Sequence, residues 1–156
     1  MSQRKQKTTP ATSTREAMPL GTLSASFISK LIYEMQKDWQ PGPKEVSATL
    51  DLRTTVEGPP NSGVREVTVY LGVRHDNDDH GAYQIEIEAV TVIGDLPADA
   101  PKEALDLHAI RVGAPIAYGL IRETLISLSA RGPYPRIVLP LVPLTAFTSE
   151  ATPPPP

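Results

Sequence analysis

The sequence has no cysteine, few aromatic residues and no long apolar run, and each absence narrows what the protein can be. Without cysteine there is no disulfide scaffold, no thiol nucleophile and no cysteine-ligated zinc, and a reducing compartment is compatible. Aromatic residues account for 5% of the 156 residues, so no large aromatic cluster or cofactor box is expected. We therefore predict a protein that binds no cofactor.

Membrane and nucleic-acid partners are also disfavoured. No apolar stretch approaches the roughly 20 residues that a membrane-spanning helix requires. Residues 1–21 are charged and threonine-rich, with no apolar segment behind them, unlike a secretory signal. The net charge is −3, and basic residues cluster only at the extreme N-terminus. These features predict a soluble, cytoplasmic protein without membrane insertion and without a nucleic-acid partner.

Familiar catalytic motifs are missing as well. The chain contains no glycine-rich phosphate loop, no G-x-S-x-G elbow and no His-x-x-x-His pattern on a helix, so no nucleophile can be named. Glu86 and Glu88 lie two residues apart and could form an acid–base pair. Alternation with Ile85 and Ile87 instead favours a solvent-facing strand surface, which could meet a basic partner. We expect no enzyme.

One segment could bind a metal. Two imidazoles and three carboxylates lie within six residues, at His75, Asp76, Asp78, Asp79 and His80. A hairpin tip also favours these residue types for conformational reasons alone. We prefer the solvated turn, and a metal-dependent enzyme stays a distant alternative.

Between two polar ends lies one domain. Residues 1–21 lack apolar periodicity and are predicted to be a disordered tail, and residues 148–156 a proline-rich disordered tail. The domain over 22–147 contains four segments of alternating polarity, which short polar loops join and which should pair antiparallel. These segments are 23–35, 46–57, 66–74 and 83–93. In the first, we expect one face to carry Phe27, Leu31, Tyr33 and Met35 and the other Ile28, Lys30, Ile32 and Glu34.

A helix is predicted from about 115 to 131. It would begin at Pro115, because proline is well accommodated at the first position of a helix, and end before Gly132 and Pro133. Residues 94–113 hold two prolines and are expected to contain one short helical turn. The long helix is apolar nearly all round, and a single sheet covers only one side of it. Its outer side therefore predicts contact with another subunit, with residues 94–113 folding back over it as the alternative.

Short motifs then suggest a family. Residues 36–41 read QKDWQP, residues 50–52 read LDL, and Arg122–Glu123 is followed by RGPYP at 131–135. In this order, from about Phe27 to Phe147, the chain resembles the SecB family of protein-export chaperones. The resemblance implies an α+β fold: a four-stranded antiparallel sheet with one long helix packed on it, assembled as a homotetramer that is a dimer of dimers.

The resemblance also implies a function. It suggests an ATP-independent chaperone that holds unfolded preproteins in apolar grooves and delivers them to the translocation motor SecA. The groove candidates, each with core packing as its rival, are Trp39, Leu50, Leu52, Tyr134, Leu144 and Phe147. Glu86 and Glu88 correspond to the acidic strand surface that contacts SecA. The oligomer interface would include Ile116, Leu120, Arg122, Glu123 and Ile126. An adaptor that uses the same scaffold to bind one folded partner is the alternative.

Overall fold

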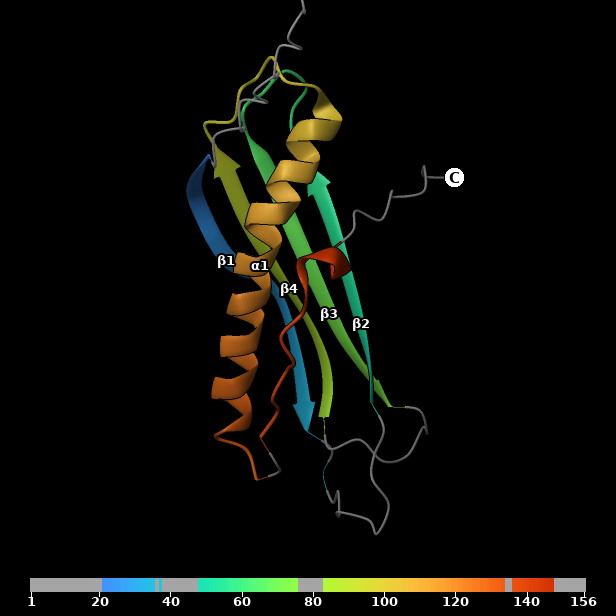
Figure 1. The fold of residues 1–156 in the computed structure, drawn as a ribbon. Coiled ribbons are helices and arrows are strands. Elements are labelled where there is room, and N and C mark those ends of the chain that lie inside the picture. The colour runs from blue at the N-terminus through green and yellow to red at the C-terminus, as the bar shows by residue number, and fades with distance from the viewer. Residues whose placement is uncertain (1–20, 36, 38–47, 76–82, 134–135, 148–156) are drawn as a thin grey trace, which may run out of the picture.

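A computed structural model of the chain describes residues 21–35, 37, 48–75, 83–133 and 136–147. Four strands precede one long helix, as Figure 1 shows. The elements are β1 (Thr22–Met35), β2 (Ala48–Glu57), β3 (Arg65–His75), β4 (Tyr83–Gly94), α1 (Lys102–Ser129) and the short 3₁₀ helix η1 (Leu144–Ala146). The predicted α+β architecture is confirmed.

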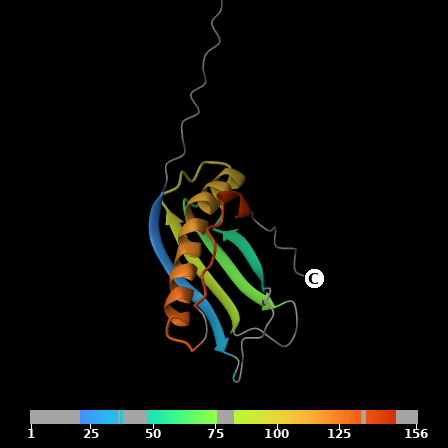
Figure 2. The same cartoon turned by 60° about the horizontal axis from the view of Figure 1, so that its bottom comes forward.

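The strands form one antiparallel sheet in the order β1-β4-β3-β2. β1 and β2 are therefore the two edges, and β3 and β4 lie in the middle (Figure 2). A compact loop from 58 to 64 joins β2 to β3, as its two prolines and two glycines indicate. The C-terminal ends of β2 and β4 thus lie at the same end of the sheet as the start of β1.

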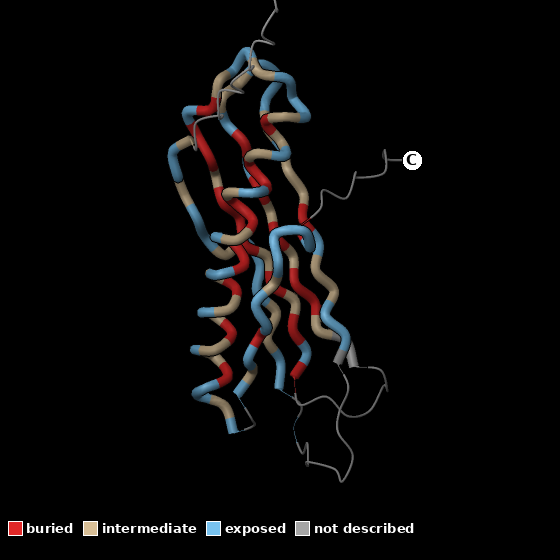
Figure 3. The backbone as a smooth tube through the Cα atoms, in the orientation of Figure 1, coloured by how far each residue is buried: buried red, intermediate tan, exposed pale blue. Residues whose placement is uncertain are grey.

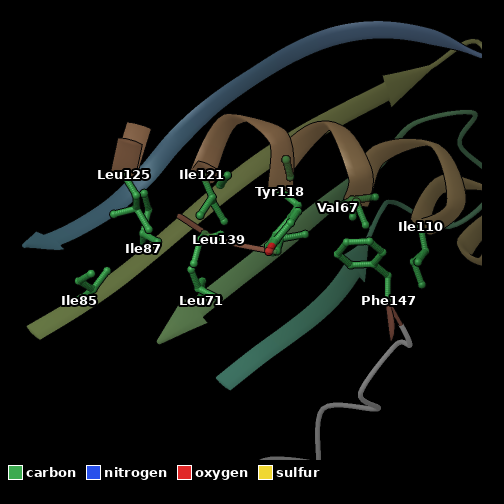
Figure 4. Packing of buried hydrophobic residues seen from close by; sticks show 14 of the residues in the cluster. Val67, Leu71, Ile85, Ile87, Ile110, Tyr118, Ile121, Leu125, Leu139 and Phe147 are labelled. Atoms are coloured by element: carbon green, nitrogen blue, oxygen red, sulfur yellow. The ribbon is translucent and has the colours of Figure 1, made fainter. Parts of the chain in front are cut away.

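Helix α1 packs across one face of the sheet, and we call the opposite face the open face. Figure 3 shows buried positions concentrated on β3, β4 and the sheet-facing side of α1. The core forms because every second residue of β3 and β4 points to the helix, as period-2 alternation requires. Its fully buried side chains include Val67, Val69, Leu71, Ile85, Ile87, Ala117, Ile121 and Leu125 (Figure 4).

The predicted face assignment of β1 is wrong in part. A register shift lies between Ile28 and Lys30, so the alternation reverses there. Ile28 pairs with Ala89 and packs against the core together with Tyr33. Phe27 pairs with Val90 and lies on the open face instead. A bulge inserts one extra residue, and no residue type in this stretch signals its position.

Helix α1 begins 13 residues before the predicted start, at Lys102, and Pro115 lies inside it. The interior proline removes one backbone hydrogen bond, which costs about 3 kcal/mol in an exposed helix. Residues before it compensate by packing, because Leu105, Ala109 and Ala114 are all buried. Residues 102–113 therefore belong to the helix itself, and 95–101 connect it to β4. The segment does not fold back over the outer side of the helix, so the alternative cover is wrong.

Burial on α1 follows one winding row of residues. From Leu105 to Ser129 every fourth residue is buried, and these positions are 105, 109, 113, 117, 121, 125 and 129. Since four residues turn a helix by about 400°, this row drifts around the axis by about 40° per step. Ile116, Leu120 and Ile126 lie outside the row and are only partly covered.

Residues 136–147, which we call the strap, run beside α1 on the same face of the sheet (Figure 1). The Ile137 amide donates a hydrogen bond to Ser129 Oγ at 3.0 Å, and the Tyr118 hydroxyl donates one to the Pro140 carbonyl at 2.9 Å. The Phe147 ring packs edge-on against Tyr118 at 5.8 Å between centroids. Before η1, residues 136–143 of the strap form neither helix nor strand and do not join the sheet, as the two prolines in this stretch lead one to expect.

A buried ion pair ties the loop between β2 and β3 to the start of α1. Arg65 is 2% exposed, and its Nε donates a hydrogen bond to Asp106 Oδ1 at 2.7 Å. Its Nη1 donates to the carbonyls of Ser62 and Val64 at 2.9 and 2.8 Å. Asp106 also accepts a hydrogen bond from Lys102 in the first turn of the helix. Protein acceptors thus bind two nitrogens of the buried Arg65 guanidinium.

Candidate functional site

An apolar groove lies between the strap and the β2 side of the sheet, and we call it the strap groove. Its volume is about 260 Å³, and it is lined by Leu50, Val73, Tyr83, Ile85, Ile137, Val138, Leu139 and Pro140. Leu139 points inward from the strap toward the core, as Figure 4 shows, and so holds the outer wall in place. The Tyr83 hydroxyl is the polar side-chain group of this lining. Such a surface favours apolar ligands with little directional preference.

The strap carries large apolar side chains to the surface around this groove. Val138 is 71% exposed, Leu141 is 83% exposed and Leu144 is 59% exposed. A single exposed apolar residue is ordinary, but several on one 12-residue segment beside an apolar groove form a patch. This patch extends the strap groove outward.

The six predicted groove residues differ in where they lie. Leu50 lines the strap groove and Leu144 lies on the exposed patch. Leu52 is half-buried and packs on the core, and Phe147 is buried against Tyr118. Both residues therefore make core contacts, the alternative to ligand binding that we considered for each candidate. Trp39 and Tyr134 lie outside the described residues.

Sequence reasoning missed most of the groove. Val73 and Ile85 were assigned to strands without a site role, and Leu144 was the one residue of the segment 136–144 that was named as a groove candidate. The sequence does contain a signal for it: Pro140 and Pro143 interrupt a run of Ile, Val and Leu and so keep this run out of the middle of a sheet. An apolar segment barred from the sheet must either be buried elsewhere or present its side chains to a ligand.

Glu86 and Glu88 lie together on the open face, where β4 alternates with its buried side. Lys30 on β1 donates a hydrogen bond to Glu86 Oε2 at 2.8 Å. This hydrogen bond raises the pKa of Lys30, and the charge of Glu88 adds to the effect. One of the two carboxylates is thus engaged by a neighbouring strand.

The predicted interface residues lie along the less buried sides of α1. Glu123 and Ile116 are exposed, whereas Leu120, Arg122 and Ile126 are half-buried. Nε of Arg122 is buried and has no hydrogen-bond partner among the described residues. A buried donor without an acceptor costs free energy, so this nitrogen marks a point where a further acceptor would stabilise the protein.

The remaining candidates yield no site in the described part of the chain. The proposed metal-binding segment falls outside it, since 76–82 and the side chain of His75 are not described. Elsewhere in the described residues, no group of three potential metal ligands comes together. Nor does any described helix have the length and apolar character needed to cross a membrane.

The fold defines a class of proteins: the chain has a SecB-like fold. One solved structure with this fold is that of the Mycobacterium tuberculosis SecB-like chaperone Rv1957, in complex with a ChAD peptide from the Rv1956 HigA1 antitoxin. The two chains share 17% identity over 79% of this chain and 91% of that one, with a TM-score of 0.64. A Streptococcus agalactiae protein of unknown function gives 13% identity over 80% and 99% of the chains, but its TM-score of 0.36 carries no argument. No protein-family model and no curated protein matches the sequence.

Proposed function

We propose that this protein is an ATP-independent molecular chaperone that binds non-native polypeptides through the strap groove. The observation that carries the proposal is the apolar groove of about 260 Å³ beside the exposed side chains of the strap. The proposal assigns no catalytic role to the chain. Its ligands would be segments of unfolded preproteins kept competent for translocation.

The groove suits extended polypeptide for two physical reasons. Burying apolar side chains releases roughly 25 cal/mol for each Å² removed from water, whatever their order in the sequence. In addition, β2 is an edge strand of the sheet that the structure describes, and Leu50 on β2 lines the groove. An extended chain can bind beside an edge strand through backbone hydrogen bonds, and such bonds do not depend on side chains. Both interactions tolerate many sequences.

The SecB-like fold supports this class of ligand. The Mycobacterium tuberculosis chaperone with this fold binds a peptide from a partner protein. By analogy, the ligand here is a polypeptide segment. Leu144 on the exposed patch and, outside the described residues, Trp39 and Tyr134 are proposed as further contacts.

We extend the proposal to assembly as a dimer of dimers. The outer side of α1 would meet a second copy through Ile116, Glu123 and the half-buried Leu120, Arg122 and Ile126. An acceptor from that copy would satisfy the buried Nε of Arg122. Light scattering of the purified protein tests this, and a monomer at micromolar concentration would exclude it.

Delivery to SecA would use the open face. Glu86 and Glu88 provide two carboxylates there, although Lys30 already binds the first at 2.8 Å. Binding should therefore depend more on Glu88. Replacing Glu88 with glutamine should weaken SecA binding more than replacing Glu86. If both variants bind SecA as tightly as the wild type, this surface does not bind SecA.

The chaperone proposal is tested by suppression of aggregation. A chemically unfolded client is diluted into buffer without nucleotide, with about one equivalent of the protein, and light scattering is followed. The wild-type protein should suppress scattering. The double variant Leu50→Ser, Val138→Ser should lose most of this effect, because both side chains line the groove and are accessible.

Leu107→Ser is the matched control. Leu107 is 49% exposed, like the groove residues, but lies on α1 outside the groove. It should suppress aggregation as the wild type does. Equal suppression by the groove variant and the control would refute the groove as the site. Binding of one folded partner, with no effect on any unfolded client, would favour the adaptor alternative.

A further inference from the structure

A second groove lies on the open face, far from the strap. It has a volume of about 400 Å³ and is lined by Glu57, Gly58, Pro59, Val64, Glu66 and Val92. We call it the acidic groove. Val92 and Val64 provide apolar surface, and Val64 is 41% exposed. The groove thus combines an apolar floor with two carboxylates at its side.

The two carboxylates belong to residues that pair directly across neighbouring strands. Glu57 on β2 pairs directly with Glu66 on β3, and both residues are exposed. No residue in the described part of the chain forms an ion pair with either. Like charges directly opposite on neighbouring strands destabilise a sheet, and a bound cation would reverse this effect. The arrangement therefore calls for a basic group with an apolar stem.

The chain itself brings such groups to this end of the sheet. Residues 1–20 precede Gly21 and β1 in the chain, and Thr22, the first residue of β1, pairs with Gly94 at the end of β4. Two residues before Gly94 on β4 is Val92, which pairs with Glu66 on β3. With about 4.8 Å between strands and about 3.3 Å per residue, roughly 12 Å separates Thr22 from Glu66. Six extended residues span about 20 Å, so Arg15 can reach the groove.

The charge of this segment is complementary. Residues 1–20 contain four basic residues, Arg4, Lys5, Lys7 and Arg15, against one acidic residue, Glu16. Met18 and Leu20 add apolar side chains next to the point of attachment. We propose that residues 1–20 dock in the acidic groove, with Arg15 placing its stem on Val92 and its guanidinium between Glu57 and Glu66. The N-terminal segment is then an intramolecular occupant of the open face.

Because the chain has no cysteine, a single spin label tests this in the full-length protein. Thr12→Cys carries the nitroxide, and amide signals are recorded from isotope-labelled protein. We expect signals of Val64, Glu66 and Val92 to broaden while that of Val138 on the strap stays sharp. Added salt should restore the signals, since ions screen exposed charges.

Charge variants identify the groove as the cause. Glu57→Gln with Glu66→Gln should abolish the broadening and leave the fold intact by circular dichroism. Glu34→Gln is the matched control, because Glu34 lies on the same face at the other end of β1 and should not matter. Broadening that survives the double change overturns the proposal, and so does broadening at no residue of the groove.

A mixing experiment separates this occupant from a second copy. Spin-labelled protein without isotopes is mixed with isotope-labelled protein without the spin label. Broadening of equal strength in this sample would mean that the segment docks on another molecule, and the intramolecular proposal would fail. The readout uses no client polypeptide, so it is independent of the proposed chaperone function.

Discussion

Two glycines in α1 allow the packing of the helix on the sheet to be tested by the same substitution at two sites. Gly113 lies on the buried row, where an added Cβ would meet Val67 Cγ2 at 3.0 Å and Val67 Cβ at 3.1 Å. Gly119 is exposed, and an added Cβ there meets no atom within 4 Å. Alanine is favoured over glycine within a helix by about 1 kcal/mol. That gain is common to both substitutions, and only the contact with Val67 differs.

The magnitude follows from how little Val67 can move. It is fully buried and pairs with Val56 on one side and Thr91 on the other. Overpacking a core by a methyl group costs about 1–3 kcal/mol. We therefore expect Gly119→Ala to raise the free energy of unfolding by about 0.5–1 kcal/mol. Gly113→Ala should lower it by up to about 2 kcal/mol, leaving a gap of roughly 1–3 kcal/mol between the variants.

Urea unfolding followed by far-UV circular dichroism measures this gap as a difference in midpoint at constant slope. Two protein concentrations should be compared, because Gly119 lies on the side of α1 that we propose for assembly. A concentration-independent result reports on folding alone. If Gly113→Ala stabilises the protein as much as Gly119→Ala, the close approach of helix and sheet is refuted.

Two further predictions concern charge. Arg65→Met should lower the free energy of unfolding by about 3 kcal/mol, because it leaves Asp106 half-buried with only Lys102. Arg53→Met, which breaks an exposed pair with Asp51, should cost about 1 kcal/mol or less, and equal losses in urea unfolding would contradict this ranking. Burial, with Tyr83 alongside, raises the pKa of Tyr33 to about 12. The unfolded chain loses this proton near pH 10, so stability should fall between about pH 10 and 12, and less steeply in Tyr33→Phe; identical slopes would count against the shift.

Alternation of polar and apolar residues was enough to predict the four strands and their antiparallel pairing. The start of the helix was missed because Pro115 is equally suited to a first turn, and only packing decides that it is interior. The residues that bury the first half of α1 include Ala109, Gly113 and Ala114. Small residues give a weak periodic signal, although they permit the closest approach to the sheet.

The strap groove was predictable only in part. Leu50 was named from the family resemblance, but the facing wall depends on how the strap returns along α1. That path is set by contacts distant in sequence, such as the Tyr118 hydroxyl with the Pro140 carbonyl, 22 residues apart. No local pattern encodes such a pairing. The acidic pair on β2 and β3 likewise emerges only when the strand register is known.

The strap's exclusion from the β-sheet has a consequence for substitutions within it. The backbone of the strap is not paired with any strand of the sheet. Substitutions in the strap can therefore change the proposed ligand-binding surface without altering strand pairing. The Ile137 amide, the Leu139 side chain, the Pro140 carbonyl and the Phe147 ring hold the strap in place. The exposed side chains of Val138 and Leu141 can therefore be substituted without loss of these contacts.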